Sequence, residues 1–234
     1  MSIERDLNLL YPFLHGTGRD QSALDTALLR SVEDKAQDSR DTNLRFFETQ
    51  GAALVVAARA LVTVYQRNGR MFAMGNGGSS CDASHFTVEF LHPVTAGRPA
   101  LAAVNLASDI AMISAVGNDV GFDQVFTRQL VAQARTGDGL IGFSTSGNSA
   151  NLIRAFEKAR ELGLTTIGFA GGDGGAMASS GYVEHCFIVP TTSIHRTQEC
   201  HVVAYHILWD LVHTLLADDR GFAKSGGTPH EICR

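Results

Sequence analysis

Two histidines, a glutamate and a glutamine are spaced so that they could bind a metal ion or transfer protons. His85 and Glu89 stand four residues apart in SSCDASHFTVEFLH, so on a helix they share one face, one turn apart. Gln198 and His206 in RTQECHVVAYH are separated by about 80° of helical rotation, so both can face one cavity. Together these side chains could ligate Zn²⁺ or a similar ion, or supply a general acid and a general base.

Alternatives remain open for this group. Glu199 is a candidate beside Gln198, because helical periodicity does not separate neighbouring positions. A lone histidine on a mostly apolar helix is more often a hydrogen-bonded core residue than a ligand. That interpretation applies to the other histidines singled out here: His92, His185, His195, His201 and His213.

Four hydroxyl side chains crowd into GLIGFSTSGNSAN, between an apolar run and a helix-like segment. They are Ser144, Thr145, Ser146 and Ser149. A helix N-terminus carries free N–H groups and partial positive charge, and hydroxyls add donors without adding charge. Capping alone needs one hydroxyl, so the sequence favours a phosphate-binding cradle at this position.

A glycine-rich loop, GNGGSS at 75–80, follows the first apolar run. Its glycines allow positive φ and close approach of a ligand, and Ser79 or Ser80 can cap the next helix. The loop is neither GxGxxG nor a Walker P-loop, and alone it would be interpreted as an ordinary turn. The acidic and amide residues Asn118, Asp119 and Asp173 end or follow other predicted elements, where turn or capping roles compete strongly, above all for Asp173.

These groups need a scaffold, and the apolar runs predict one. Strands are expected at 70–74, 100–104, 139–143, 165–169 and 185–189. None alternates cleanly between apolar and polar residues, as in a parallel sheet covered by helices on both faces. Helices are expected at 79–91, 108–116, 122–135, 148–162, 174–180 and 194–217. The pattern is that of a doubly wound α/β fold, in which ligands bind at the carboxyl ends of the strands.

The chain before the first strand is expected to be helical. Residues 21–67 lack proline and predict two helices, the second almost wholly apolar in GAALVVAARALVTVY. An apolar helix of this kind often packs in a subunit interface. We expect a loosely ordered arm over 1–20, a single domain over 21–217 and a flexible tail over 218–234.

Composition restricts the function classes. The 234 residues are 44% hydrophobic, which is enough for a sizeable core, and the net charge of −5 gives no general attraction for nucleic acid or an anionic membrane. The N-terminus lacks the features of a signal peptide, and no apolar stretch reaches ~18 residues, so no membrane span is expected. The four cysteines form no CxxC pair, and we expect reduced thiols in a cytoplasmic protein.

Four segments, in this order, resemble the phosphoheptose isomerases, the sedoheptulose 7-phosphate isomerase branch of the SIS domain proteins. They are GNGGSSCDASHFTVEF, AVGNDVGFDQVFTRQ, GDGLIGFSTSGNSANLIRAFEKARELGLTTIGFAGGDGG and RTQECHVVAYHILWDLV, and the resemblance runs from about residue 22 to 217. It implies a five-stranded parallel sheet of flavodoxin-like type and a homotetramer joined by helices. It also implies an aldose-ketose isomerisation of sedoheptulose 7-phosphate to D-glycero-D-manno-heptose 7-phosphate through an enediol.

The resemblance assigns roles residue by residue. It implies Zn²⁺ on His85, Glu89, Gln198 and His206, with Glu89 and His206 as the acid/base pair. The implied substrate-binding positions are Asn76, Gly77, Gly78, Asn118, Asp119, Ser144, Thr145, Ser146, Ser149 and Gln198. A residue whose lone pairs bind zinc cannot act freely as a base. Two roles of zinc therefore stay open: a Lewis acid that polarises the substrate carbonyl, or a structural support for the site.

Two other functions also stay open. The stretches HPVTAGRPA and PTTSIHRTQE depart from the family pattern, which leaves room for an isomerase of a different sugar phosphate. A related non-enzymatic SIS protein regulates replication initiation, and in that branch the positions matching Glu89 and His206 are not acid/base residues. Both are present here, which favours an enzyme.

Overall fold

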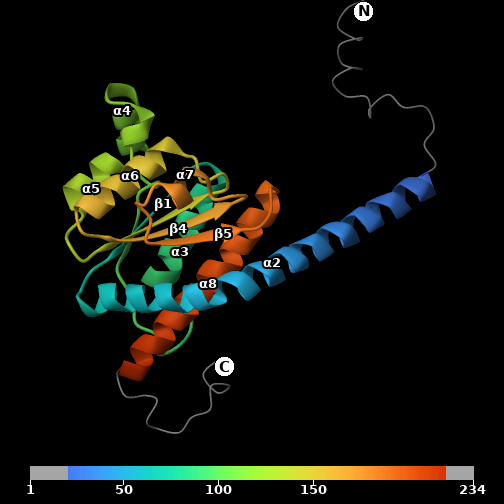
Figure 1. Cartoon of the computed structure of the whole chain (residues 1–234), viewed down its shortest axis with the longest axis horizontal. Helices are drawn as coiled ribbons and strands as arrows, with labels where there is room; N and C mark the ends of the chain where they lie inside the picture. Colours follow the sequence, from blue (N-terminus) through green and yellow to red (C-terminus); the bar gives the residue numbers. More distant parts are fainter. Residues whose placement is uncertain (1–20, 220–234) are drawn as a thin grey trace, which may run out of the picture. The chain divides into compact units, whose positions relative to one another are not determined.

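A five-stranded parallel sheet forms the centre of the computed structural model, which describes residues 21–219 (Figure 1). Its strands are β1 Met71–Gly75, β2 Ala103–Asn105, β3 Gly139–Ser144, β4 Thr165–Gly171 and β5 His185–Val189. They pair in the order β2-β1-β3-β4-β5, and all neighbours are parallel. The chain therefore moves outward from β1 to β2, then returns to β3 on the other side. This order creates a topological switch point between the carboxyl ends of β1 and β3, where open α/β sheets bind ligands.

The predicted doubly wound α/β fold is confirmed. Every residue of β1 and β3 is buried, as the unbroken apolar runs predict for central strands covered on both faces. The second strand is shorter than expected: it covers three residues at the edge of the sheet and pairs only with β1.

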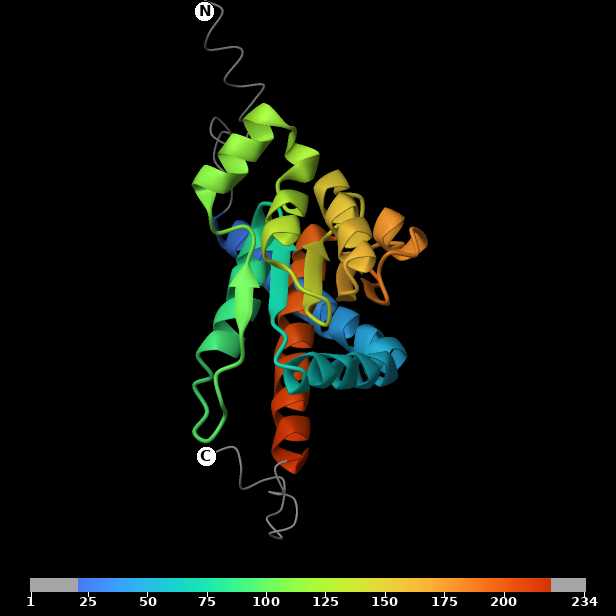
Figure 2. The same cartoon turned by 90° about the vertical axis from the view of Figure 1, so that its left-hand side faces the viewer.

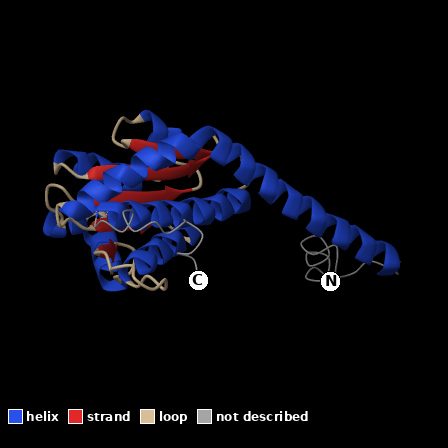
Figure 3. Cartoon of the chain, turned by 90° about the horizontal axis from the view of Figure 1, so that it is seen from below, coloured by secondary structure: helices blue, strands red, loops and turns tan. Residues whose placement is uncertain are grey.

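Helices cover both faces of the sheet (Figures 2 and 3). Their bounds are α2 Gln21–Gln66, α3 Gly78–Leu91, α4 Ile110–Asp119, α5 Thr127–Gln133, α6 Ala150–Glu161, α7 Gly175–Ser179 and α8 Ile194–Asp219, with a 3₁₀ turn, η2, at Phe122–Gln124. One apolar core joins α3, α8 and the later part of α2 to one face of the sheet. A second core joins α4, α5, α6 and α7 to the opposite face.

Two helix predictions are wrong in detail. A single helix, α2, replaces the two helices expected over 21–67. No proline interrupts it, and Gly51 costs a helix only about 1 kcal/mol, so nothing in the sequence forces a break. The helix expected over 122–135 is instead η2 followed by α5, after Gly121 with its φ of 126°.

The contacts divide the chain into two compact units, one ending at Arg40 and one beginning at Asp41. The described part of the first unit, 21–40, is helical. The second unit holds the sheet and every site residue that the sequence predicts. The predicted arm over 1–20 lies outside the described residues, as does the predicted tail except for Asp218 and Asp219, which end α8.

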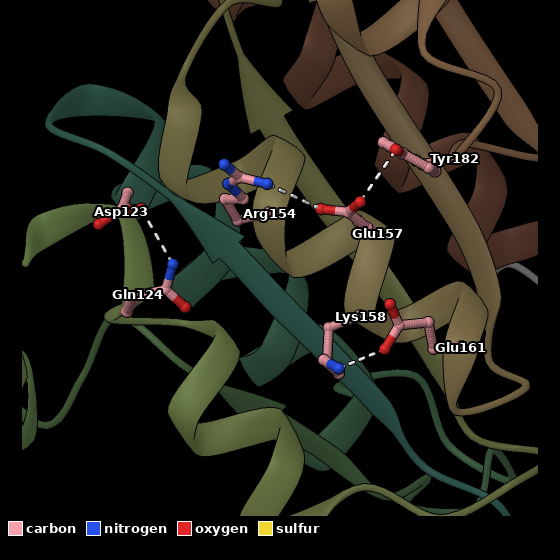
Figure 4. Close-up of polar contacts among 7 residues, drawn as sticks. All are labelled: Asp123, Gln124, Arg154, Glu157, Lys158, Glu161 and Tyr182. Carbon is pink, nitrogen blue, oxygen red and sulfur yellow. Dashed lines mark hydrogen bonds and ion pairs between the residues drawn. The ribbon is translucent and has the colours of Figure 1, made fainter. Parts of the chain in front are cut away.

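Polar side chains on the outer side of α6 connect this helix to the segment before β5 (Figure 4). Glu157 accepts hydrogen bonds from Tyr182 Oη at 3.0 Å and from Arg154 Nη1 at 3.2 Å, and Lys158 pairs with Glu161. The Tyr182 hydrogen bond, followed by that of Arg154, lowers the pKa of Glu157. Exposed pairs of this kind stabilise a fold only slightly, and α6 is held on the sheet mainly by its buried apolar side chains.

By length and composition alone, α2 and α8 are each apolar enough to cross a membrane. The buried core helices of many soluble proteins meet the same criterion. The expectation of no membrane partner stays a prediction.

Candidate active site

Two helices bring three of the predicted ligands together. His85 and Glu89 lie on α3 and His206 on α8, and all three are half-buried. His85 Nε2 lies 3.1 Å from Glu89 Oε1 and 3.4 Å from His206 Nε2. One potential ligand atom from each residue lies within 4.8 Å of the others. The α3 helix starts at Gly78, three residues after β1, and His85 and Glu89 lie about two and three turns along it.

The cluster has the chemistry of a zinc site. Two imidazoles and a carboxylate are common zinc ligands, and a site with three protein ligands leaves a position open for substrate or water. Burial, followed by the nearby charge of His85, lowers the pKa of His206. The lowered pKa favours the neutral imidazole, which is the form that binds a metal. The residues therefore fit a zinc ion.

The structure separates Gln198 from Glu199. A Cβ atom at Gly78 would overlap the Gln198 side-chain amide nitrogen and stand 3.3 Å from its Cδ, so Gln198 lies against the start of α3. Glu199 instead accepts a hydrogen bond from Arg196 Nη2 at 2.6 Å. Gln198 thus lies at the glycine loop, and Gly78 leaves room for it.

The sequence analysis missed three residues that surround the cluster. Tyr205 Oη lies 2.7 Å from His85 Nδ1, and Trp209 Nε1 donates to the backbone carbonyl of Glu89 at 2.8 Å. Asp82 is buried on α3, and burial raises its pKa to about 6, while His85 opposes the rise. The i, i+4 spacing of Tyr205 and Trp209, on the helix that also carries His206, was the signal that could have found two of them.

The hydroxyl run is only partly convergent. Ser144 ends β3 and is buried, and its Oγ lies 3.2 Å from Ser149 Oγ and accepts from the Gly147 N–H at 3.2 Å. Ser149 stands just before α6, and its side chain makes no capping hydrogen bond. Ser146 is exposed, and its Oγ accepts from the Asn148 N–H at 3.2 Å. Ser144 and Ser149 are therefore the two hydroxyls that the fold aims at one point.

The loop that carries these hydroxyls packs tightly against the loop before α7. Gly147 has a φ of 65°, and its carbonyl accepts from the Met177 N–H at 2.9 Å. Asn148 Oδ1 accepts from the Ala176 N–H at 2.9 Å, and Thr145 accepts through its carbonyl from the Gly171 N–H at 3.1 Å. These bonds hold the hydroxyl loop in one conformation.

The structure tests the turn and capping roles that the sequence offered for three other residues. Asp173 accepts a hydrogen bond from the Gly175 N–H at 3.0 Å, which agrees with the turn interpretation. Ser79 and Ser80 do not cap α3, because the cap residue is Gly77, with a φ of 52°, and both serines lie inside the first turn. The residues that follow β4 and β5 line an open depression. They are Gly172, Asp173, Pro190, Thr191 and Thr192.

Paired asparagines join the two loops at the switch point. Asn76 Nδ2 donates to Asn151 Oδ1 at 2.8 Å, and Asn151 Nδ2 returns a bond to Asn76 Oδ1 at 2.9 Å. Asn151 was missed, although it closes the STSGNSAN segment. Asn118 and Asp119 end α4, are exposed, and hydrogen bond to each other at 2.7 Å. Within residues 21–219, they make no polar contact with the other predicted site residues.

Of the five histidines interpreted as core residues, two are buried, two are exposed, and His185, at the start of β5, is half-buried. His201 is fully buried and donates to the Ala170 carbonyl at 3.4 Å, and burial lowers its pKa to about 4. His213 is also buried. His92 and His195 are exposed, so the core interpretation is wrong for them: each lies at a helix end rather than on an inward face.

A glycine loop and a hydroxyl loop at the switch point of a parallel sheet define the SIS class of sugar-phosphate domain, and the SIS domain family model matches residues 36–171. The chain belongs to the SIS domain family, and its relatives place it in the phosphoheptose isomerase branch. It is 37% identical over 190 residues to the phosphoheptose isomerase of Roseiflexus sp. (strain RS-1), which covers 81% of this chain and 95% of that protein. It is 43% identical over 160 residues to that of Citrifermentans bemidjiense, over 68% of this chain and 82% of the relative.

Solved structures agree with this family. The phosphoheptose isomerase from Francisella tularensis superposes with a TM-score of 0.76 at 32% identity, over 80% of this chain and 98% of that chain. The phosphoheptose isomerase from Neisseria gonorrhoeae gives a TM-score of 0.74 at 35% identity, over 80% and 99%.

Proposed function

We propose that this protein converts sedoheptulose 7-phosphate to D-glycero-D-manno-heptose 7-phosphate, as an aldose-ketose isomerase that works through an enediol. The observation that carries the proposal is the convergence of His85, Glu89 and His206 from two helices, in a chain whose β3 loop also brings the Ser144 and Ser149 hydroxyls together. The first group offers proton transfer, and the second offers hydrogen-bond donors for a phosphate. The relatives named above are phosphoheptose isomerases, which supports this reaction.

The reaction moves protons at two carbons and two oxygens. C1 of the ketose loses a proton while the C2 carbonyl oxygen gains one, which gives the enediol. The C1 hydroxyl then loses its proton while C2 gains one, which gives the aldose. Glu89 and His206 approach the same point from α3 and α8, so one can remove the proton while the other returns it. The hydroxyl cradle holds the distant phosphate, so binding energy there orients the reacting carbons.

Zinc would bind to His85, Glu89 and His206, with the Gln198 amide as a further ligand. When bound, it would polarise the substrate carbonyl or hold the surrounding side chains in place. Trp209 fixes the backbone at Glu89, and Tyr205 contacts His85, so this chain orients its candidate ligands through neighbouring residues.

The assembly, substrate-contact residues, domain limits and compartment belong to the same proposal. We expect a homotetramer, as the resemblance to the phosphoheptose isomerases implies, and three apolar side chains on the later part of α2 that are 40% or more exposed, Leu44, Val55 and Val56, offer a subunit contact. We expect one SIS domain over 21–217 in a cytoplasmic enzyme that binds neither nucleic acid nor membrane. In addition to the two cradle serines and Gln198, the proposed substrate contacts are Asn76, Gly77, Gly78, Asn118, Asp119, Thr145 and Ser146.

An isomerase assay on purified protein, as isolated, after chelation and with zinc restored, tests the proposal. We expect turnover of sedoheptulose 7-phosphate that is lost on chelation and regained with zinc, because the cluster would lose its ion. Turnover that is insensitive to chelation would support the isomerase activity and contradict a requirement for zinc. A panel of five-, six- and seven-carbon ketose phosphates tests whether the protein prefers a substrate other than sedoheptulose 7-phosphate. No turnover on any of them by folded protein would contradict the enzyme and favour a regulatory protein.

Replacing Ser144 or Ser149 by Ala is expected to raise KM roughly 10- to 100-fold with a smaller change in kcat, because each hydroxyl would donate to a charged phosphate. Steady-state kinetics measure the effect. Thr63→Ala is the matched control, since the exposed Thr63 hydroxyl only donates within its own helix, to the Arg59 carbonyl. An unchanged KM in both serine variants would rule out the cradle.

A further inference from the structure

Tyr205 is the buried partner of the histidine at the centre of the cluster. Its side chain is 1% exposed, and its Oη lies 2.7 Å from His85 Nδ1. The other ring nitrogen of His85, Nε2, faces Glu89 Oε1 at 3.1 Å. Nε2 thus faces the other two members of the cluster, Glu89 and, at 3.4 Å, His206 Nε2, whereas Nδ1 faces only Tyr205.

These two contacts define the ring tautomer of the metal-free site. A carboxylate accepts hydrogen bonds, so His85 Nε2 carries the proton that points at Glu89. His85 Nδ1 then accepts from the Tyr205 O–H. A cation on Nε2 needs a lone pair there, so the ring proton must instead stand on Nδ1. One proton leaves Nε2 and one arrives at Nδ1, and the imidazole stays neutral.

A hydroxyl can serve both tautomers, because it donates and accepts. In the metal-free state Tyr205 donates to Nδ1, and in the second state it accepts from the Nδ1–H. In that second state the Tyr205 O–H needs a new acceptor. Asp82 is 6% exposed, and its Oδ2 has no hydrogen-bond partner among residues 21–219. It stands three residues before His85 on α3, so the two side chains lie on the same side of the helix.

We propose that Tyr205 is a positioning residue that allows His85 to adopt the cation-binding tautomer, with the buried Asp82 carboxylate accepting a hydrogen bond from the Tyr205 O–H in that state. This inference rests on the proposed cation site. It adds Tyr205 of α8 as the residue that sets the tautomer of the candidate ligand His85 on α3.

Zinc affinity of Tyr205→Phe, measured by competition with a chromophoric chelator, tests the inference. We expect roughly 10- to 100-fold weaker binding, the usual cost of losing a hydrogen bond behind a metal ligand. Tyr65→Phe is the control, because the Tyr65 hydroxyl is buried without a hydrogen-bond partner among the described residues. It should bind zinc as the wild type does. Equal zinc affinity of wild type and Tyr205→Phe would overturn the inference.

Nitrogen-15 NMR of His85 in the wild type provides a measurement that does not depend on any variant. We expect the proton on Nε2 without zinc and on Nδ1 with zinc. In Tyr205→Phe the zinc-free ring should keep its proton on Nε2 beside Glu89, whereas the zinc-bound Nδ1–H should lose its acceptor and change its chemical shift, a change that a purely structural role of Tyr205 would not produce. An Nδ1 that stays unprotonated in the zinc-bound wild type would overturn the inference. Wild-type protein that binds no zinc would overturn both the cation site and this inference, while the isomerase assay decides the reaction separately.

Discussion

Replacing Glu89 by Gln is expected to lower kcat about 10²- to 10⁴-fold, the usual contribution of a positioned acid or base. Glutamine has nearly the same shape and keeps an oxygen that can face His85, but it cannot take up the substrate proton. The fold should persist, because the Trp209 hydrogen bond goes to the backbone of residue 89 and not to its side chain. Turnover at saturating substrate, with size-exclusion chromatography for the assembly, measures both parts.

A surface carboxylate provides the control for Glu89. Glu161 pairs with Lys158 on the outer side of α6, and Glu161→Gln should leave kcat unchanged (Figure 4). Zinc content of each variant separates two roles of Glu89. Loss of turnover with zinc retained indicates proton transfer, whereas loss of both indicates that Glu89 is chiefly a ligand. Full activity of Glu89→Gln would show that the proposed mechanism is wrong.

Replacing Gly147 by Ala is expected to destabilise the protein by about 2–5 kcal/mol, for two reasons that add. Gly147 has a φ of 65°, which L-residues with a side chain rarely adopt. A Cβ atom there would also overlap the Gly174 carbonyl oxygen and stand 2.6 Å from its carbon, and backbone cannot move aside as a side chain can. The melting temperature should fall by roughly 5–15 °C. KM should rise as well, because Gly147 lies between Ser144 and Ser149.

Gly172 separates the two causes. Its φ is 64°, nearly that of Gly147, but a Cβ atom there would meet nothing within 4 Å. Gly172→Ala should therefore cost only the backbone term, about 1–2 kcal/mol. The difference in melting temperature between the two variants measures the collision with Gly174. Equal melting temperatures would mean that the loop before α7 moves away freely, and the cradle would then be less rigid than the structure indicates.

The sequence alone determined the sheet and the local geometry of the site. Burial on both faces leaves an unbroken apolar run such as LIGF, and this signal is contained in a few consecutive residues. The His85 and Glu89 pair is equally local, since four residues on one helix must share a face. The four segments that resemble the phosphoheptose isomerases, and their order, are also visible in the sequence alone. They led to the family to which the relatives and the SIS domain model assign the chain.

Only the tertiary structure decided which residues meet across elements. The approach of α8 to α3 distinguishes Gln198 from Glu199 and brings Tyr205 to His85. It also shows that Asn151 pairs with Asn76. Asn76 and Asn151 are 75 residues apart in the chain, and His85 and Tyr205 are 120 residues apart. Gln198 and Glu199 are adjacent, and only the residues that face each of them distinguish their roles. Sequence periodicity describes the face of one element, whereas a contact depends on the packing of two, and that packing is a property of the whole core.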